Sequence, residues 1–198
     1  MAKAKAKSVE SDQVVEIPRI EIERMIIPVV GDSPLIVHKW SEKAKKEMLD
    51  KQMKVAKKGR EAKDPQRDFE ESIYLHPEGG YGFPSIAFKC AAVDACRFTD
   101  GTKMTVARGA FHVEGEFVKI QGDEPKPRED MVRVGMGTAD IRYRAEFTNW
   151  RAEIPVSYNK HALSKEQIVN LFNLAGFGVG VGEWRPEKNG QFGRFHVG

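Results

Sequence analysis

Residues 164–176, Ser-Lys-Glu-Gln-Ile-Val-Asn-Leu-Phe-Asn-Leu-Ala-Gly, predict the last helix of the chain and the way the fold closes. Ser164 and Gln167 form a capping-box pattern, in which each side chain bonds the backbone N–H of the other residue. Apolar side chains then recur at helical spacing, and Gly176 stands where a C-terminal cap belongs. A glycine-rich stretch follows this helix and leads into a short final strand.

Upstream of this helix, apolar segments alternate with polar turns. The expected elements are strands at 20–30, 111–120, 131–134, 139–147 and 150–157, helices at 41–58 and 85–98 with Ser41 and Ser85 as caps, a hairpin at 72–84, and a polar loop at 123–130. This order contains no repeated strand–helix alternation. It predicts an α+β fold, in which an antiparallel sheet has two or three helices on one side.

The expected organisation is one folded unit preceded by an arm. Residues 1–17 are mostly lysine, alanine, serine and acidic residues, and they predict a disordered basic arm. Residues 18–198 predict a single α+β domain. Within it, residues 41–70 are expected to form a basic helical insertion or flap.

Composition limits the functional classes. The chain has 198 residues and a formal net charge of +3, so any electrostatic argument rests on local clusters. No apolar run reaches the roughly 18–20 residues of a membrane span, and the first residues lack the apolar core of a signal peptide, so we expect a soluble, cytoplasmic protein without a membrane partner. Cys90 and Cys96 lie about 240° apart on one expected helix and are not expected to pair. No metal-binding spacing occurs, and we expect no cofactor.

A basic segment follows the first strand. From Lys43 to Arg67 the sequence has ten basic and four acidic residues, a local excess of +6. Such a run is commonly a solvated helix face, and the competing interpretation is an exposed flap that meets phosphates. The candidate phosphate contacts in this segment are Lys43, Lys46, Lys54, Lys57 and Lys58.

A second basic and aromatic cluster lies on and beside the strands expected between residues 131 and 157. Its members are Arg128, Arg133, Arg142, Tyr143, Arg144, Trp150 and Arg151. Arg142 and Arg144 share one face of a strand, and guanidinium groups pair with phosphates and stack on bases. The alternative is a salt-bridged sheet face, in which the arginines pair with Asp130, Asp140 and Glu146.

The glycine-rich stretch, residues 176–197, carries the most specific pattern. Its glycines do not fit a dinucleotide fingerprint, because that motif needs a strand before it and a helix after it. The sequence Gly180-Val-Gly-Glu-Trp-Arg-Pro-Glu-Lys-Asn-Gly-Gln-Phe-Gly-Arg194 resembles the C-terminal G-rich loop of the RAMP superfamily, the CRISPR-associated Cas7-like, Cas5-like and Cas6-like proteins. The first strand, residues 33–37 and the basic insertion are similar to Cas7-like backbone subunits. A glycine-rich turn formed for purely structural reasons is the alternative.

The resemblance implies a ferredoxin-like, RRM-type fold and a non-catalytic protein that binds single-stranded RNA or DNA. It also implies self-association along the strand, as a homo-oligomer or filament. The chain resembles small phage proteins that share such loops, which implies the cytoplasm of a bacterial host. The candidate contacts in the loop are Gly180, Gly182, Trp184, Arg185, Lys188 and Arg194.

Two residues near the first turn are weak candidates for catalysis. His38 lies near the region where Cas6-like nucleases carry a catalytic histidine, and Asp32 lies in the turn before it. They define an alternative function, that of a metal-independent endoribonuclease of the Cas6-like kind. The remaining alternative is a phage structural or protein-interaction component, whose basic segment is merely solvated.

Overall fold

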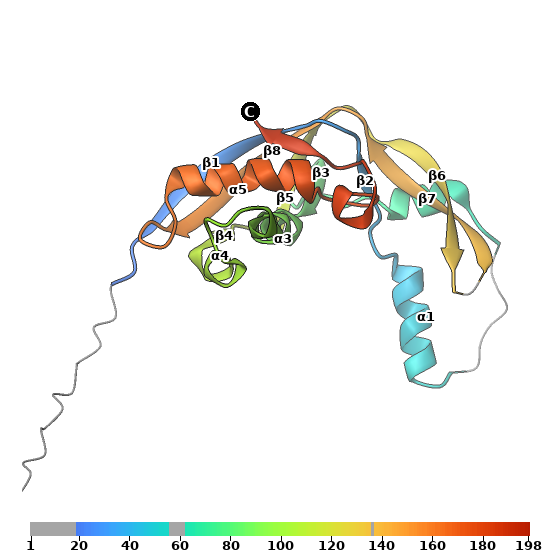
Figure 1. Cartoon of the computed structure of the whole chain (residues 1–198). Coiled ribbons are helices and arrows are strands. Elements are labelled where there is room, and N and C mark those ends of the chain that lie inside the picture. The colour runs from blue at the N-terminus through green and yellow to red at the C-terminus, as the bar shows by residue number, and fades with distance from the viewer. Residues whose placement is uncertain (1–18, 56–61, 136) are drawn as a thin grey trace, which may run out of the picture.

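The computed structural model describes residues 19–55, 62–135 and 137–198, so the expected arm at residues 1–17 lies outside the described part of the chain. The strands are β1 Ile22–Gly31, β2 Leu35–Val37, β3 Tyr81–Pro84, β4 Phe111–Val113, β5 Phe117–Gly122, β6 Lys126–Val134, β7 Thr138–Phe147, β8 Trp150–Asn159 and β9 Phe195–Val197. The helices are α1 Glu42–Gln52, α2 Pro65–Glu71, α3 Ser85–Ala95, α4 Met104–Ala110 and α5 Lys165–Gly178, with the short turns η1 Cys96–Phe98 and η2 Pro186–Lys188. This mixed content confirms the predicted α+β class (Figure 1).

The larger sheet is built around β1 and β8. Its strand order is β3-β5-β8-β1-β9, with β4 also paired to β8, and every pairing is antiparallel. In chain order, β1, α3, β5, β8, α5 and β9 form a strand-helix-strand-strand-helix-strand unit with the sheet order β5-β8-β1-β9. This is the ferredoxin-like arrangement.

The core lies between this sheet and helices α3 and α5. Ile27 and Val29 of β1 point into it and meet Phe88 of α3 and Phe172 of α5, all at most 1% exposed. Each such side chain stabilises the fold by about 1.5–3 kcal/mol relative to an exposed position. Because side chains alternate along a strand, the β1 residues that alternate with Ile27 and Val29 point to the opposite face of the sheet.

The capping box of the last helix is present as expected. The Ser164 hydroxyl accepts from the Gln167 N–H, and the Gln167 side chain accepts from the Ser164 N–H at 2.8 Å. The expected cap at Gly176 is wrong, because α5 continues to Gly178 with Val179 as its C-cap. Gly176 instead allows β9 to approach, since a Cβ on it would lie 1.9 Å from the Phe195 carbonyl oxygen.

The second sheet, β2-β7-β6, is formed mainly by a long hairpin. The expected polar loop at 123–130 is wrong from residue 126 onward, because β6 begins at Lys126 and pairs with β7 along its whole length. Helix α2 packs on this hairpin, and the Lys63 ammonium lies 2.5 Å from the Asp140 carboxylate. The hairpin therefore extends the body beside the ferredoxin-like unit.

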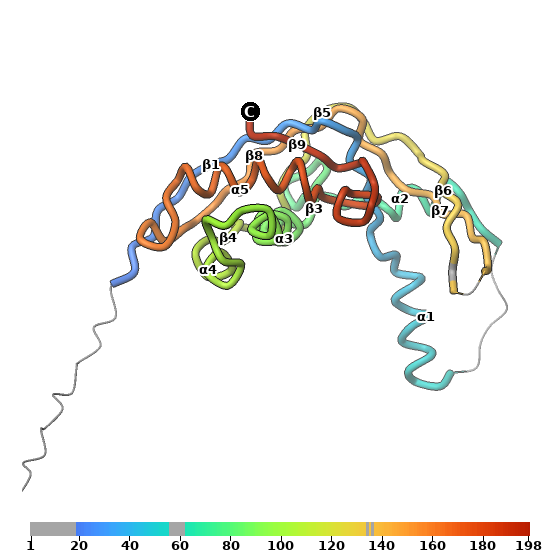
Figure 2. The backbone as a smooth tube through the Cα atoms, viewed as in Figure 1, coloured from blue at the N-terminus to red at the C-terminus, as the bar shows by residue number. Residues whose placement is uncertain are grey.

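Helix α1 stands away from the body, as the backbone trace shows (Figure 2). The Ser41 hydroxyl caps it as predicted, but it ends at Gln52 rather than near residue 58, and none of its residues is buried. A backbone hydrogen bond of 2.9 Å from Lys39 to Ser72 joins the two ends of the insertion.

Two further expectations, for residues 111–120 and for Ser85, are wrong. The strand expected at 111–120 is broken into β4 and β5, and helix α4 before it was not expected. Ser85 is the first residue of α3, and Pro84 is the N-cap of this helix. The Ser85 hydroxyl donates to the Gly115 carbonyl.

Candidate functional site

The loop between α5 and β9 separates two hollows. An inner hollow of about 270 Å³ lies between the loop and α3, and an outer groove of about 540 Å³ lies between the loop and β6. Glu183 and Arg185 line the inner hollow, whereas Trp184 between them lines the outer groove. The outer groove is completed by Ser33, Arg128, Asp130, Gly190, Gln191, Phe192 and Arg194.

The glycines of the loop bring it close to its own chain. Gly180, Gly182 and Gly193 have φ values of 71°, 80° and 65°, a region that side chains rarely adopt. A Cβ on Gly182 would lie 2.5 Å from the Ile36 carbonyl oxygen, and one on Gly193 would lie 1.7 Å from that of Val181. Gly180 is buried, and a Cβ on it would lie 2.7 Å from Cδ of Pro186. Neither Gly180 nor Gly182 therefore enters the nucleic-acid interface proposed below.

Trp184 is held at the surface by a strained backbone. Its φ is 54°, uncommon for a bulky residue, and its side chain remains 38% exposed at the groove. The indole N–H donates to Asp130 at 3.3 Å, and the ring lies 5.6 Å from the Arg144 guanidinium. Gly190 permits this geometry, because a Cβ there would lie 1.7 Å from the Trp184 carbonyl oxygen.

Asp130 connects strands β6 and β7 to the loop between α5 and β9. Its carboxylate accepts from Arg128 and Arg144, each at 2.9 Å, as well as from Trp184. Burial alone would raise the pKa of Asp130, but the hydrogen bonds from Arg144, Arg128 and Trp184 outweigh it and lower the pKa. The carboxylate therefore stays ionised and fixes the floor of the groove.

The paired arginines on the hairpin follow the salt-bridged alternative. Arg144 is 3% exposed and lies 3.8 Å from Glu183 in addition to its bond with Asp130, so it is not a surface cation. Arg128 also bonds Glu146 at 2.8 Å, and Arg142 lies 4.0 Å from Asp140. Arg142 and Arg144, which the sequence suggested as phosphate contacts, therefore lie beside carboxylates of the protein itself.

Two side chains complete the outer groove on the loop side. The Arg128 guanidinium lies 4.7 Å above the ring of Phe192, and the Arg194 N–H donates to the Ser33 hydroxyl at 2.9 Å. The Arg194 guanidinium has a 3.3 Å bond to the Gln191 carbonyl, and no carboxylate partner is seen for it in the described part of the chain. The Arg194 guanidinium is therefore available to an anionic ligand. Phe192 was not among the residues expected to contact nucleic acid, because its approach to Arg128 depends on the pairing of β6 with β7.

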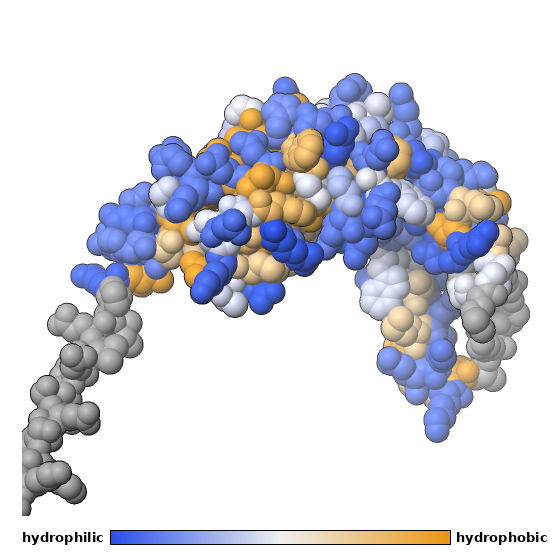
Figure 3. All heavy atoms as spheres, in the orientation of Figure 1, coloured by the Kyte–Doolittle hydropathy of each residue, from blue (hydrophilic) through white to orange (hydrophobic). Residues whose placement is uncertain are grey.

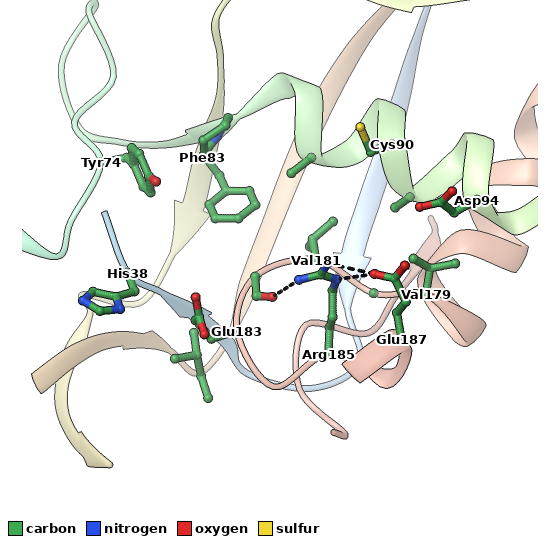
Figure 4. Close-up of a pocket in the computed structure, with 16 residues that line it drawn as sticks. His38, Tyr74, Phe83, Cys90, Asp94, Val179, Val181, Glu183, Arg185 and Glu187 are labelled. Carbon is green, nitrogen blue, oxygen red and sulfur yellow. Dashed lines mark hydrogen bonds and ion pairs between the residues drawn. The ribbon is translucent and has the colours of Figure 1, made fainter. Parts of the chain in front are cut away.

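The inner hollow has a different character (Figure 4). His38, Tyr74 and Glu183 lie at one end of it, and Arg185 with Glu187 lies at the other. The Arg185 guanidinium bonds Glu187 at 2.8 Å and the Gly182 carbonyl at 3.1 Å, so it serves the loop rather than a ligand. Burial, followed by the nearby positive charge of Arg144, lowers the pKa of His38.

The candidate lysines are distributed unevenly. Lys46 and Lys54 are exposed on and just after α1, Lys43 lies at its first turn, and Lys188 is exposed in η2. Lys57 and Lys58 fall outside the described residues. Helix α1 itself has four lysines and three acidic residues, together with exposed Met48 and Leu49, so it is not a purely basic face (Figure 3).

Asp32 lies apart from His38. It is exposed after β1, and its carboxylate bonds Nδ1 of the exposed His196 on β9 at 2.6 Å. Among the described residues, no group of three histidine, cysteine or acidic side chains is arranged to hold a metal ion.

Comparisons with known proteins add a distant structural similarity. No family model and no curated protein matches the chain. A solved structure that does match, the crystal structure of Cmr6 from Pyrococcus furiosus, covers 91% of this chain and 100% of its own, with 11% sequence identity and a TM-score of 0.48. The ferredoxin-like arrangement is shown by the strand order of the larger sheet and not by this similarity. Within the described ranges, no helix has the length and apolar character that crossing a bilayer requires.

Proposed function

We infer that this protein binds single-stranded nucleic acid in the outer groove. The observation that carries the proposal is Trp184, a large aromatic ring left 38% exposed on a strained backbone. Strained backbone persists where the surrounding structure determines it, and it is concentrated at functional sites. An exposed aromatic ring offers a stacking platform that every base fits.

The chemistry around Trp184 suits an unpaired strand. Phe192 offers a second ring, and Arg194 lies in the same groove without a carboxylate partner among the described residues. Stacking supplies about 1–3 kcal/mol per base, and a cation on the rim meets the phosphates between bases. Lys188 of η2 and the lysines of α1 are further phosphate contacts in this proposal. Binding to RNA or to DNA, and self-association along the strand, remain predictions of the sequence resemblance.

The test is a titration of unstructured RNA and DNA oligonucleotides at several salt concentrations. Trp184→Ala is expected to weaken binding more than tenfold, while Trp184→Phe, which keeps a ring, is expected to retain most of the affinity. Arg194→Ala is expected to reduce the log–log salt slope by about 0.7, the contribution of one phosphate on a single strand.

Trp40→Ala is the matched control, because Trp40 is 51% exposed but does not line the groove. Thermal melts check that every variant is folded at the temperature of the titration. If Trp184→Ala is folded and binds like the wild type, the groove is not the binding site.

A second candidate function, RNA cleavage in the inner hollow, is favoured by His38. Its lowered pKa leaves the imidazole neutral at neutral pH, which a general base requires, and Glu183 and Tyr74 line the same hollow. Cleavage of labelled RNA in EDTA that is lost in His38→Ala would support this function. RNA left intact by the wild type excludes it.

A further inference from the structure

The larger sheet has one face that no helix of the described residues covers. Helices α3, α4 and α5 lie together on the other side of the sheet, where the core is (Figures 1 and 2). The open face of β1 carries Ile22, Arg24, Ile26, Pro28 and Val30, which alternate with the buried Ile27 and Val29. Open faces of antiparallel sheets usually carry polar side chains, so this apolar row on β1 is unusual.

The row is exposed and is extended by its neighbours. Ile22, Ile26 and Val30 are 56%, 64% and 40% exposed. In the antiparallel register, Ile26 lies opposite Pro155 of β8, and Pro28 lies opposite Glu153. The other β8 residues beside the row are polar, among them Ser157 opposite Arg24 and Arg151 opposite Val30. Exposed apolar surface with a polar rim marks an interaction surface.

The chemistry of the row favours a protein partner over nucleic acid. Its branched aliphatic side chains and prolines offer no ring on which a base stacks. Its charges are mixed, since Arg24 bonds Glu114 at 3.0 Å and Glu153 lies beside Pro28. The face is therefore suited to a surface that is itself apolar with a few charges of both signs.

We propose that the open face of the larger sheet, Ile22 to Val30 of β1 with its β8 neighbours, is the interface of a two-fold dimer of this chain. A two-fold axis through Ile26 brings Ile26 against its mate and Ile22 against Val30 of the second copy, since an isologous interface pairs a patch with itself. The same axis brings Arg24 over Pro28 of the second copy, beside that copy's Glu153. The apolar row of one copy packs on the apolar row of the other. Each Arg24 lies near Glu153 of the second copy, and symmetry gives two such pairs.

The size of the face fits a small interface. Strands β1 and β8 have ten residues each, whereas β5 has six, β3 has four, and β4 and β9 have three each. At about 3.3 Å per residue and about 4.8 Å between strands, these strands cover roughly 570 Å². A standard interface buries about 800 Å² on each partner, so the dimer is expected to be weaker than a standard one. Two sheets packed face to face about 10 Å apart are an established arrangement.

The test is the molar mass of the full chain in solution, measured without oligonucleotide over a range of concentrations. The wild type is expected to dimerise at micromolar concentrations. Ile26→Asp is expected to weaken the dimer at least a hundredfold, because it places a carboxylate against its own mate. Ile86→Asp is the matched control, since Ile86 is 61% exposed on α3 and lies away from this face.

Two further variants keep the result decisive. Ile26→Thr preserves strand propensity and is expected to weaken the dimer by at least tenfold, should Ile26→Asp not fold. Glu153→Arg is expected to weaken it, because this change places an arginine beside Arg24 of the second copy. A wild type that is monomeric at all concentrations, or an Ile26→Thr variant that dimerises like the wild type, overturns the proposal. None of these outcomes depends on binding in the Trp184 groove.

Discussion

Asp130 shows how much of the site depends on one carboxylate. It accepts hydrogen bonds from Arg128, Arg144 and Trp184, and Arg144 is buried. Removing one partner of a buried pair leaves a charge without compensation, so Asp130→Ala is expected to lower the free energy of unfolding by about 3–5 kcal/mol. Urea unfolding measures this loss. Glu129→Ala, on the exposed neighbour in β6, is the control and is expected to stay within about 0.5 kcal/mol of the wild type.

His38 is expected to make the stability of the folded protein depend on pH. Its pKa in the folded protein is lowered by burial and then by Arg144, so folding favours the neutral imidazole. The stability that this contributes is present above the ordinary histidine pKa of about 6.5 and is lost as the pH falls through the lowered pKa of the folded state. The melting temperature is therefore expected to drop more between pH 7 and pH 5 in the wild type than in His38→Gln. Equal drops in both proteins would show that the His38 environment is not linked to stability.

At the scale of elements, the contact of α5 with β9 depends on a glycine inside a helix. A Cβ on Gly176 would lie 1.9 Å from the Phe195 carbonyl oxygen, so Gly176→Ala forces the last strand away from the helix. We expect a loss of at least about 1–3 kcal/mol in unfolding free energy, as in other overpacked cores. Gly109 of α4 is exposed with open space around it, and Gly109→Ala is expected to gain about 0.4–1 kcal/mol. A Gly176→Ala protein that melts like the wild type contradicts the packing of β9.

The same elements explain what the sequence could predict. Helix α5 and strand β1 follow local rules, a capping box and an apolar alternation, and both were placed correctly apart from their ends. Strand β6 was missed in part, because cross-strand ion pairs between residues such as Arg128 and Glu146 replace the apolar alternation that identifies a strand. Trp184 was identified from its neighbours in sequence. Asp130 was expected only as an ion-pair partner of the sheet arginines. Its hydrogen bond with Trp184 was not expected, because the two residues meet only through the β6 register.

At the scale of the whole molecule, the protein consists of a packed body and one projecting helix. The insertion leaves the body at Lys39 and returns at Ser72, where a 2.9 Å backbone bond joins the two ends. Helix α2 of the insertion packs on the hairpin, whereas α1 buries nothing. Its exposed Trp40, Met53 and Val55 at either end increase the apolar surface that water meets there. The body is thus expected to fold with or without α1.

This division predicts a wide range of amide exchange rates in one chain. An isolated helix needs more than about 12–15 residues to be stable in water, and α1 has 11 residues and no buried side chain to compensate. Its amides are therefore expected to exchange within seconds, whereas those of β1 and β8, which pair along nine residues each, exchange only by global unfolding. Hydrogen exchange measured by mass spectrometry on the free protein checks both rates. Addition of an oligonucleotide is expected to protect α1 if its lysines meet phosphates. Protection of α1 in the free protein would instead show that it packs against another surface.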